Sequence, residues 1–364
     1  MLVTCLTAIE KCLPEADCEV IVVTNNCSDA SADRAGRFPF VQVVDEPNTA
    51  FSKARDTGAR AAEGELLLFM DDDAILQPGT LSATIKIFKE NENCAIIAGK
   101  IEPEFMREPP AWALKCQETH NAWSLYMLEV PIKNNSNVIN VQSACGPLMI
   151  VKKSVYWQVG GFPPDTIGVE TNSGSGNFMK LYVGPGDYGL STLVRQAGFS
   201  ILYSNEVAVK HVIPAFRMTV QFWISRYWGE GSYVAITESQ FFRQNRLQSA
   251  RRIIGMRIRL ALYRFRLARK HLTRMDASTL SPDDLDMLLT ESYLATKRVL
   301  RRHANLAELL WNMAAEGVSD TNFETVLATL PETYLRLVSL NLDSVAANPD
   351  RFRAIRLHIN SALK

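Results

Sequence analysis

Short apolar runs alternate with amphipathic stretches over the first hundred residues of the chain. Apolar positions at helical spacing predict an opening helix that ends at Pro14 and two further helices at Phe51–Ala62 and Thr80–Glu90. Aliphatic and β-branched runs predict the strands that separate them, at Glu19–Thr24, Val41–Val44, Leu66–Met70 and Cys94–Ala98. This alternation predicts an α/β fold with a mostly parallel sheet built from βαβ units.

The apolar run from Leu66 leads directly into three carboxylates, Asp71, Asp72 and Asp73. A strand buried on both faces that ends in polar residues is typical of a sheet that delivers a site at its carboxyl edge. If the backbone stays extended, Asp71 and Asp73 project to the same side. Two carboxylates that close favour a raised pKa on one of them or a bound Mg²⁺ or Mn²⁺. The alternative interpretation is a polar turn that leads into the next helix.

The middle of the chain is less regular. Between Glu102 and Val130 the pattern loosens into an aromatic-rich, Pro-broken insertion, whose rings suit either a sugar ligand or a small hydrophobic core. Residues Val138–Lys152 then predict a pair of strands interrupted at Gly146 and Pro147. The sequence of this insertion does not decide whether its aromatic rings bind a sugar or pack against one another.

Two polar residues stand next to predicted elements later in the chain. Asp187 lies at the start of a helical run, where a carboxylate either caps free N–H groups or serves a site. Short strands are predicted at Ser200–Tyr203 and Val207–Val209, and His211 follows the second of them. A single histidine is more often structural than a ligand, so other features must decide its role.

The composition is that of an ordinary globular protein. The chain has 364 residues, of which 47% are hydrophobic and 21% charged, and its formal net charge of zero implies no nucleic-acid partner. Its seven scattered cysteines include no Cys-x-x-Cys pair and predict free thiols in a reducing cytoplasm. No apolar run reaches the roughly 18 residues needed to span a bilayer, and the start lacks a signal-peptide layout. We therefore expect a cytoplasmic protein, soluble or peripheral to a membrane.

The last third of the chain begins with a strongly basic segment. Residues 241–275 contain eleven Lys and Arg residues and no acidic residue. Two apolar stripes at helical spacing run through this stretch, one through Ile254 and Ile258 and the other through Met256 and Leu260. Such a helix can lie on an anionic membrane surface, or it can pack on both sides with solvated arginines between.

Helical signals continue to the end. Ser281–Asp284 has the cap, proline and acidic residues of a helix start, and Asp320–Leu330 and Glu332–Leu342 complete a helical region. We therefore divide the chain into an α/β domain at 1–235, a basic amphipathic helix at 236–275 and an α-helical C-terminal region at 276–364.

Several motifs follow one another in a recognisable order up to residue 232. They are the strand and turn of Glu19–Asp29, the run Ala54–Gly58, the acidic strand to Asp73, Gly146, the turn Gly160–Phe162, the helix Asp187–Gly198, the segment His211–Arg217 and Gly229–Ser232. Together they resemble the inverting nucleotide-sugar glycosyltransferases of the GT-A fold, in particular family 2.

The resemblance implies a function and a set of roles. The reaction would move a hexosyl group from a nucleotide-sugar to a hydroxyl of a glycan or lipid-linked acceptor, with inversion, as in polysaccharide biosynthesis. Asp71, Asp73 and His211 would hold Mg²⁺ or Mn²⁺, in the manner of a DXD motif. Asp187 would be the general base. The residues implied to contact the nucleotide-sugar are Thr24, Asn25, Asp29, Arg55, Asp71 and Arg217.

The sequence departs from the family pattern in three places. The family's first strand, which precedes the opening helix, is absent, and this predicts a gap in the sheet and, as a hypothesis, further residues upstream of Met1 in the natural protein. Thr24 and Gly186 stand where the family often has acidic residues. These departures keep open a non-catalytic binding or scaffold function. A nucleotidyltransferase is a third hypothesis, since it shares metal carboxylates but needs no base at Asp187.

Overall fold

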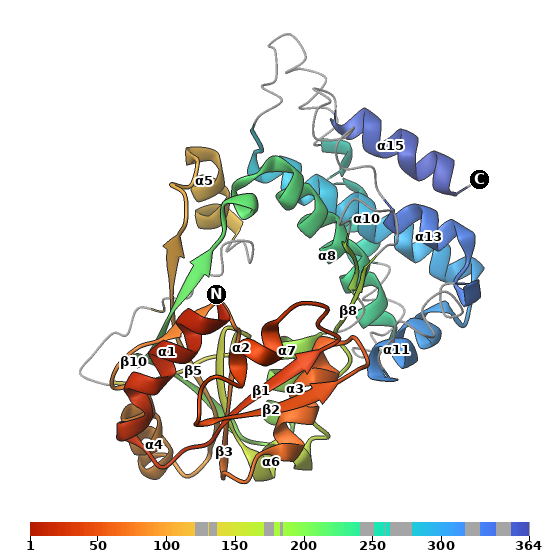
Figure 1. The fold of residues 1–364 in the computed structure, drawn as a ribbon. Coiled ribbons are helices and arrows are strands. Elements are labelled where there is room, and N and C mark those ends of the chain that lie inside the picture. Colours follow the sequence, from red (N-terminus) through yellow and green to blue (C-terminus); the bar gives the residue numbers. More distant parts are fainter. Residues whose placement is uncertain are drawn as a thin grey trace.

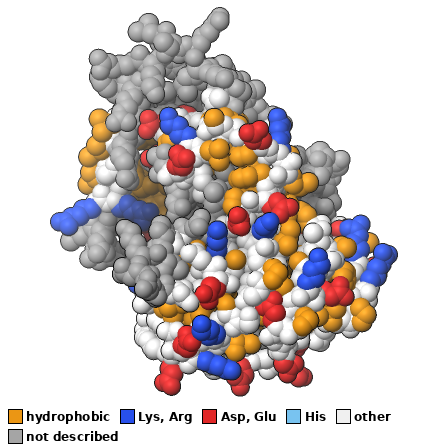
Figure 2. Space-filling model, turned by 90° about the vertical axis from the view of Figure 1, so that its left-hand side faces the viewer, with side chains coloured by type: hydrophobic (Ala, Val, Ile, Leu, Met, Phe, Trp, Pro, Cys, Tyr) orange, Lys and Arg blue, Asp and Glu red, His pale blue; other side chains and the backbone are white. Residues whose placement is uncertain are grey.

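The chain folds into an α/β unit and a helical region. The computed structural model describes residues 1–120, 130, 137–170, 178–182, 185–240, 251–258, 260–262, 279–316, 328–339 and 351–363. The α/β unit forms the lower part of Figure 1, and the helices of the C-terminal third lie above it. Acidic and basic side chains are mixed over the face drawn in Figure 2, as expected for zero net charge. The predicted α/β class with a C-terminal helical appendage is confirmed.

The first hundred residues form the alternating elements that the hydrophobic pattern predicts. These are α1 (Leu2–Cys12), η1 (Leu13–Glu15), β1 (Val20–Asn25), α2 (Ser31–Ala35), β2 (Val41–Glu46), α3 (Phe51–Ala61), β3 (Leu66–Met70), β4 (Ala74–Leu76), α4 (Thr80–Glu90) and β5 (Cys94–Phe105). The pattern missed α2 and β4, because elements of five and three residues are too short to establish a period.

The remaining elements of the α/β unit surround the site described below. They are α5 (Ala111–His120), β6 (Ile139–Asn140), β7 (Leu148–Lys152), α6 (Lys153–Gln158), β8 (Thr166–Glu170), β9 (Phe178–Tyr182), α7 (Gly186–Gln196), β10 (Ser200–Ile213) and η2 (Ala215–Met218). The predicted pair of strands around Gly146 corresponds to β6 and β7, and α5 occupies part of the aromatic-rich insertion.

The central sheet has the order β3-β7-β5-β10-β4, with β6 paired to β10. β7 is antiparallel to both β3 and β5, so those two strands run in the same direction, and β10 is parallel to β5. Apolar side chains form one core on each face. Residues of α3, α6 and α7 contribute to the first core, and residues of α1 and α4 contribute to the second.

β10 is one long strand where the sequence predicted two short ones. A register shift against β5 lies between Ser204 and Ala208, at the polar residues that resemble a turn in the sequence. Beyond the shift, β5 and β10 stay paired, β10 also pairs with β4 at Val209–His211, and the two strands extend toward α5 (Figure 1). His211 therefore lies within this strand and does not follow it.

β1 and β2 form a separate parallel pair beside the central sheet. Every residue of β1 and of β3 lines one cavity of about 2350 Å³. Successive side chains of a strand point to opposite faces, so a cavity touched by consecutive residues meets the edge of each strand. The gap that the sequence predicts in the sheet therefore lies between β1 and β3.

The C-terminal helices share a core of their own. The described helices are α8 (Val220–Gln240), α10 (Pro282–Arg302), α11 (Leu306–Glu316), α13 (Glu332–Val338) and α15 (Arg351–Ala362). α10 starts with the predicted cap, in which Ser281 Oγ accepts a hydrogen bond from the Asp284 backbone at 3.3 Å. The predicted domain boundary after residue 235 falls inside α8, whose apolar residues belong to this helical core.

Close packing of α8 on α10 depends on Gly231. A Cβ at Gly231 would lie 2.3 Å from the Leu289 carbonyl oxygen and 2.7 Å from Ser292 Cβ. We expect Gly231→Ala to lower the free energy of unfolding by about 1–3 kcal/mol, the usual cost of overpacking. Gly255→Ala is the matched control, because nothing lies within 4 Å of the added methyl group. Thermal unfolding of both variants measures the difference, and equal stability would contradict the packing argument.

The basic stretch is described only in part, at residues 251–258 and 260–262, and its predicted helix is present there. Met256 and Leu260 are buried in the helical core, whereas Ile254 and Ile258 are 57% and 54% exposed. The second predicted stripe thus packs inward and the first faces outward. Across the part of the chain that the structure describes, none of the helices combines the length and apolarity required to cross a bilayer.

Candidate active site

The acidic triplet forms a turn. β3 ends at Met70, and the Ala74 backbone N–H donates to the Asp71 carbonyl at 3.1 Å. The expectation of an extended backbone through the triplet is therefore wrong. The turn reverses the chain into β4, which pairs with β10 so that Ala74 lies opposite His211. The same turn places Asp71 and Asp73 at the carboxyl end of β3, as predicted, although of the five β3 residues only Leu67 is fully buried.

Asp71, Asp73 and His211 converge on one point. Each offers a ligand atom, and these three atoms lie within 4.8 Å of one another. His211 Nε2 is 3.1 Å from Asp73 Oδ1, and the histidine side chain is 1% exposed. Two carboxylates and an imidazole form a donor set that suits a divalent cation such as Mn²⁺. The structure thus brings together the three residues predicted as metal ligands.

The pKa values of the two carboxylates in this cluster shift in opposite directions. Burial raises the pKa of Asp71 to about 6, although Arg55 opposes the shift, and the charge of Asp73 adds to it. Burial acts in the same direction on Asp73, but the His211 hydrogen bond and the Arg217 guanidinium outweigh it and hold the pKa of this carboxyl below its usual range. Arg217 Nη2 lies 3.5 Å from Asp73 Oδ2. A raised and a lowered pKa side by side are typical of functional sites.

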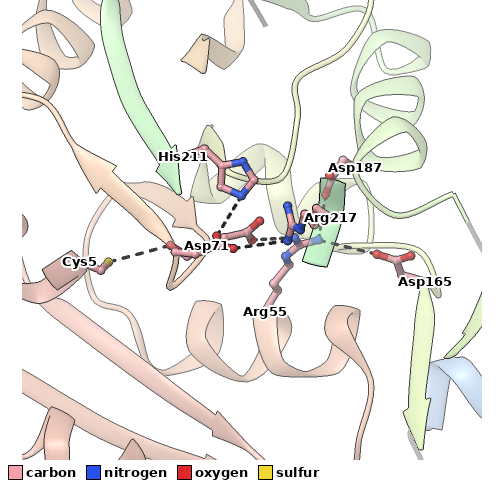
Figure 3. Close-up of polar contacts among 8 residues, drawn as sticks. Cys5, Arg55, Asp71, Asp165, Asp187, His211 and Arg217 are labelled. Atoms are coloured by element: carbon pink, nitrogen blue, oxygen red, sulfur yellow. Dashed lines mark hydrogen bonds and ion pairs between the residues drawn. The ribbon is translucent and has the colours of Figure 1, made fainter. Parts of the chain in front are cut away.

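Arg55 on α3 connects the acidic turn to α7. Its guanidinium lies 2.8 Å from Asp187 Oδ1, 3.7 Å from Asp71 Oδ1 and 3.9 Å from Asp165 Oδ2. Figure 3 shows these carboxylates around the guanidinium, with His211 above the acidic turn. The Arg55 guanidinium carbon also lies 4.8 Å from the centroid of the Phe162 ring. Arg55 thus bridges Asp71 of the three-residue cluster and Asp187.

Asp187 does not act as the predicted helix cap. The N-cap position of α7 is Pro185, and no side-chain cap is formed there. The Asp187 carboxylate instead accepts a hydrogen bond from Arg55 and faces Gly146. A Cβ at Gly146 would lie 2.7 Å from Asp187 Oδ2 and 3.0 Å from Arg55 Nη2, so only glycine leaves this pair in place. Asp187 is therefore not a side-chain cap of α7, and its carboxylate lines the cavity in an ion pair with Arg55.

Asp165 belongs to this cluster but is missing from the sequence prediction. It lines the cavity and lies directly after the turn Gly160–Phe162 and two prolines. Its carboxylate also approaches Gly186, where a Cβ would lie 2.5 Å from Asp165 Oδ2. The small residue that departs from the family pattern at position 186 thus leaves room for Asp165. The sequence signal was an acidic residue close to a glycine turn, which is common on any surface.

The residues predicted on the nucleotide side are spread out. Thr24 and Asn25 line the cavity, but both are engaged locally. The Thr24 hydroxyl donates to Asp45 Oδ1 at 2.7 Å, and the Asn25 amide donates to the Glu46 and Asn48 carbonyls at 2.9 and 2.7 Å. Asp29 is exposed and accepts from the Ser31 N–H at 2.9 Å. The structure does not bring Asp29 to the metal cluster.

The first part of the chain is similar to a known protein family. Residues 1–160 match the model of glycosyl transferase family 2. This confirms the resemblance on which the sequence prediction relied. The family 2 segment contains Arg55, the acidic turn and Gly146, while Asp187 and His211 follow it in the chain.

Two relatives carry glycosyltransferase names. The chain is 22% identical over 146 residues to an "Uncharacterized glycosyltransferase" of Haemophilus influenzae, which covers 39% of this chain and 45% of the relative. It is 22% identical over 222 residues to "Glucosyl-dolichyl phosphate glucuronosyltransferase" of Haloferax volcanii, which covers 58% of this chain and 64% of the relative. The chain thus spans about half to two thirds of the length of these relatives.

Solved structures show weaker overall similarity. The mannosyltransferase PcManGT from Pyrobaculum calidifontis, in complex with GDP-Man and Mn²⁺, has a TM-score of 0.41 and 15% identity, and the alignment covers 98% of this chain and 82% of that one. GalNAc-T7 with UDP, GalNAc and Mn²⁺ has a TM-score of 0.39 and 13% identity, with coverages of 60% and 44%.

Proposed function

We propose that this protein is a metal-dependent inverting glycosyltransferase that moves a sugar from a nucleotide-sugar donor to a hydroxyl of a glycan or lipid-linked acceptor. The observation that carries the proposal is one cavity lined by Asp71 and Asp73, the two carboxylates of the cluster with His211, and by Asp187, a carboxylate bound to Arg55. The cluster can hold a cation that stabilises a leaving diphosphate, and Asp187 can accept the proton of an attacking hydroxyl. The match of residues 1–160 to glycosyl transferase family 2 supports the same chemistry.

The donor would bind at the acidic turn. Asp71, Asp73 and His211 fit a divalent cation, either Mg²⁺ or Mn²⁺, because they combine hard oxygen donors with one imidazole. When bound, the cation would stabilise the negative charge that develops on the diphosphate. Arg217, which lies beside Asp73, adds a guanidinium that suits phosphate oxygens. Thr24 and Asn25 are in position to border the nucleoside.

The acceptor hydroxyl would be activated by Asp187. An alcohol has a pKa far above 7, so its attack on the anomeric carbon requires a base within hydrogen-bond reach. The proton passes from the hydroxyl to the Asp187 carboxylate as the new glycosidic bond forms and the bond to the diphosphate breaks. One displacement of this kind inverts the anomeric centre. Arg55 holds the Asp187 carboxylate in place at 2.8 Å and acts as a positioning residue.

Calorimetric titration with nucleoside diphosphates tests the proposal. UDP, GDP, ADP, CDP and dTDP are each titrated into the full chain with and without Mn²⁺. We expect one of them to bind in a metal-dependent manner, which would also identify the donor class. A folded protein that binds none of them would contradict the donor site. The gap between β1 and β3 would then favour the second function, a non-catalytic binding or scaffold protein.

We further propose that the outward stripe of the basic helix rests on an anionic membrane surface, on the cytoplasmic side. Ile254, Ile258 and Leu262 follow one another at four-residue spacing and are 57%, 54% and 53% exposed. Arg251 and Arg257 on the same stretch supply positive charge. Apolar residues flanked by arginines are the composition of an interfacial helix.

Vesicle sedimentation tests the membrane proposal. We expect binding to vesicles of phosphatidylcholine with phosphatidylglycerol and little binding to phosphatidylcholine alone. Replacing two half-exposed isoleucines in the double variant Ile254→Ser, Ile258→Ser should weaken binding on the order of tenfold or more, because each isoleucine contributes about 1.5–3 kcal/mol when fully buried. Leu357→Ser on α15 is the control, since Leu357 is 61% exposed but lies outside the stripe. Equal loss in both variants would contradict the proposal.

A further inference from the structure

One face of α8 carries polar side chains that the proposed reaction does not use. Arg226, Glu230, Tyr233 and Thr237 follow one another at spacings of four, three and four residues, which places them on one side of a helix. All four line the cavity that contains Asp187 and Arg55. We call these residues the α8 polar stripe.

The rest of α8 explains why this stripe faces the cavity. Trp223, Tyr227 and Gly231 lie on the side that packs into the helical core, with Gly231 directly against α10. Ser225 and Ser239 are exposed to solvent. Core packing therefore fixes the rotation of α8 about its axis and directs the stripe toward the site. Its polar residues are not simply the solvated face of a surface helix.

The stripe lies beside the proposed base. Arg226 Nη2 is 3.8 Å from Glu230 Oε2, and these side chains are only 19% and 24% exposed. Burial raises the pKa of Tyr233, and the charges of Glu230, Asp165 and Asp187 raise it further. The phenol therefore lies within the electrostatic reach of the carboxylates around Arg55.

The buried hydroxyl of Thr237 points to a ligand at the α8 polar stripe. The residue is 2% exposed, and its hydroxyl has no hydrogen-bond partner among the residues that the structure describes. Buried hydroxyls are nearly always paired, because leaving one unpaired costs stability. A hydroxyl that lines a cavity can regain a partner from a ligand. The pairing missing at Thr237 is thus one that a polar ligand can supply.

We propose that the α8 polar stripe binds the acceptor, and that it recognises a neutral sugar through its hydroxyl groups. This inference rests on the proposed transferase function and adds the acceptor side to it. The positive charge of Arg226 is balanced by Glu230, and nearby the two carboxylates of Asp165 and Asp187 face the single guanidinium of Arg55, which leaves an excess of negative charge. An acceptor phosphate would be repelled there, whereas sugar hydroxyls can donate to Glu230 and accept from Arg226, Tyr233 and Thr237.

Binding measurements on the full chain test the inference. In the presence of Mn²⁺ and the nucleoside diphosphate that binds, saturation-transfer NMR is used to titrate p-nitrophenyl glucoside, galactoside, mannoside and N-acetylglucosaminide. We expect at least one glycoside to bind. Thr237→Val should weaken its binding about threefold to tenfold and Glu230→Gln about tenfold, in proportion to the hydrogen bonds lost. Nucleoside diphosphate affinity should stay within about twofold in both variants.

A stability measurement separates binding from a structural role. Thr237→Val keeps the volume and removes an unpaired hydroxyl, so its thermal stability should equal or exceed that of the unchanged protein. Ser225→Ala, an exposed position off the stripe, is the control and should change nothing. Farnesyl phosphate is titrated in the same way, as a probe for a phosphate-bearing lipid acceptor. The inference is overturned if no glycoside binds while the nucleotide does. It is also overturned if farnesyl phosphate binds and its binding is the only one that Thr237→Val and Glu230→Gln weaken. Absence of nucleotide binding would instead refute the proposed transferase.

Discussion

Asp187→Asn is expected to lower the rate of sugar transfer by about 10²- to 10⁴-fold, the usual contribution of a general base. The amide keeps the shape of the side chain but cannot accept the proton of the acceptor hydroxyl. Metal-dependent binding of the nucleoside diphosphate should stay close to that of the unchanged protein, because Asp187 lies across Arg55 from the metal cluster. Initial rates of transfer and calorimetric affinities, measured on the same samples, check both statements.

Asp165→Asn is the matched control for this prediction. Asp165 also faces the Arg55 guanidinium, at 3.9 Å where Asp187 lies at 2.8 Å. Loss of either negative charge disturbs Arg55, but we expect only Asp187→Asn to remove the base. Asp165→Asn should therefore retain most of the transfer rate. A severe loss in Asp165→Asn together with a mild loss in Asp187→Asn would reassign the base to Asp165.

Asp73→Asn is expected to weaken metal-dependent nucleotide binding at least about 100-fold. Loss of groups that only support metal ligands costs about 10–100-fold in affinity, and Asp73 is placed to be a ligand itself. It also contacts His211 and Arg217, so the substitution loosens both of them. Calorimetric titration with Mn²⁺ and the nucleoside diphosphate measures the change.

Asp72→Asn is the control for the acidic turn. Asp72 is the neighbour of Asp73 and is exposed, but it is outside the three-residue cluster. The substitution removes the same charge from the same turn, so a purely electrostatic effect on the cation would appear in both variants. We expect nucleotide affinity in Asp72→Asn to fall less than about tenfold. Similar losses in the two variants would mean that Asp73 does not bind the metal directly.

Helices and strands followed from local pattern where the pattern was long enough. The strand Leu66–Met70 was recognisable as a continuous apolar run, and the helix Phe51–Ala61 from the helical spacing of its apolar residues. β10 was divided in two because its polar bulge at Ser204–Glu206 resembles a turn, and only pairing with β5 keeps the strand continuous. Tertiary pairing overrides local propensity at such points.

The candidate site followed from the sequence less completely. Asp71 and Asp73 were predicted from their place at the end of a buried strand, and His211, Arg55 and Asp187 from the family resemblance. The sequence could not tell whether Asp187 caps a helix or faces a site. Its contact with Arg55 joins residues 132 positions apart, and no local pattern contains that information.

By itself, the sequence determined the α/β class, the acidic edge of the sheet and the helical C-terminal region, because burial and capping leave periodic marks on neighbouring residues. Only the tertiary structure decided that the acidic triplet turns back toward His211, that Asp165 joins Arg55, and that α8 directs its polar stripe into the same cavity. These features depend on strand pairing and helix packing between distant segments. The energies that fix them act across space and leave no period along the chain.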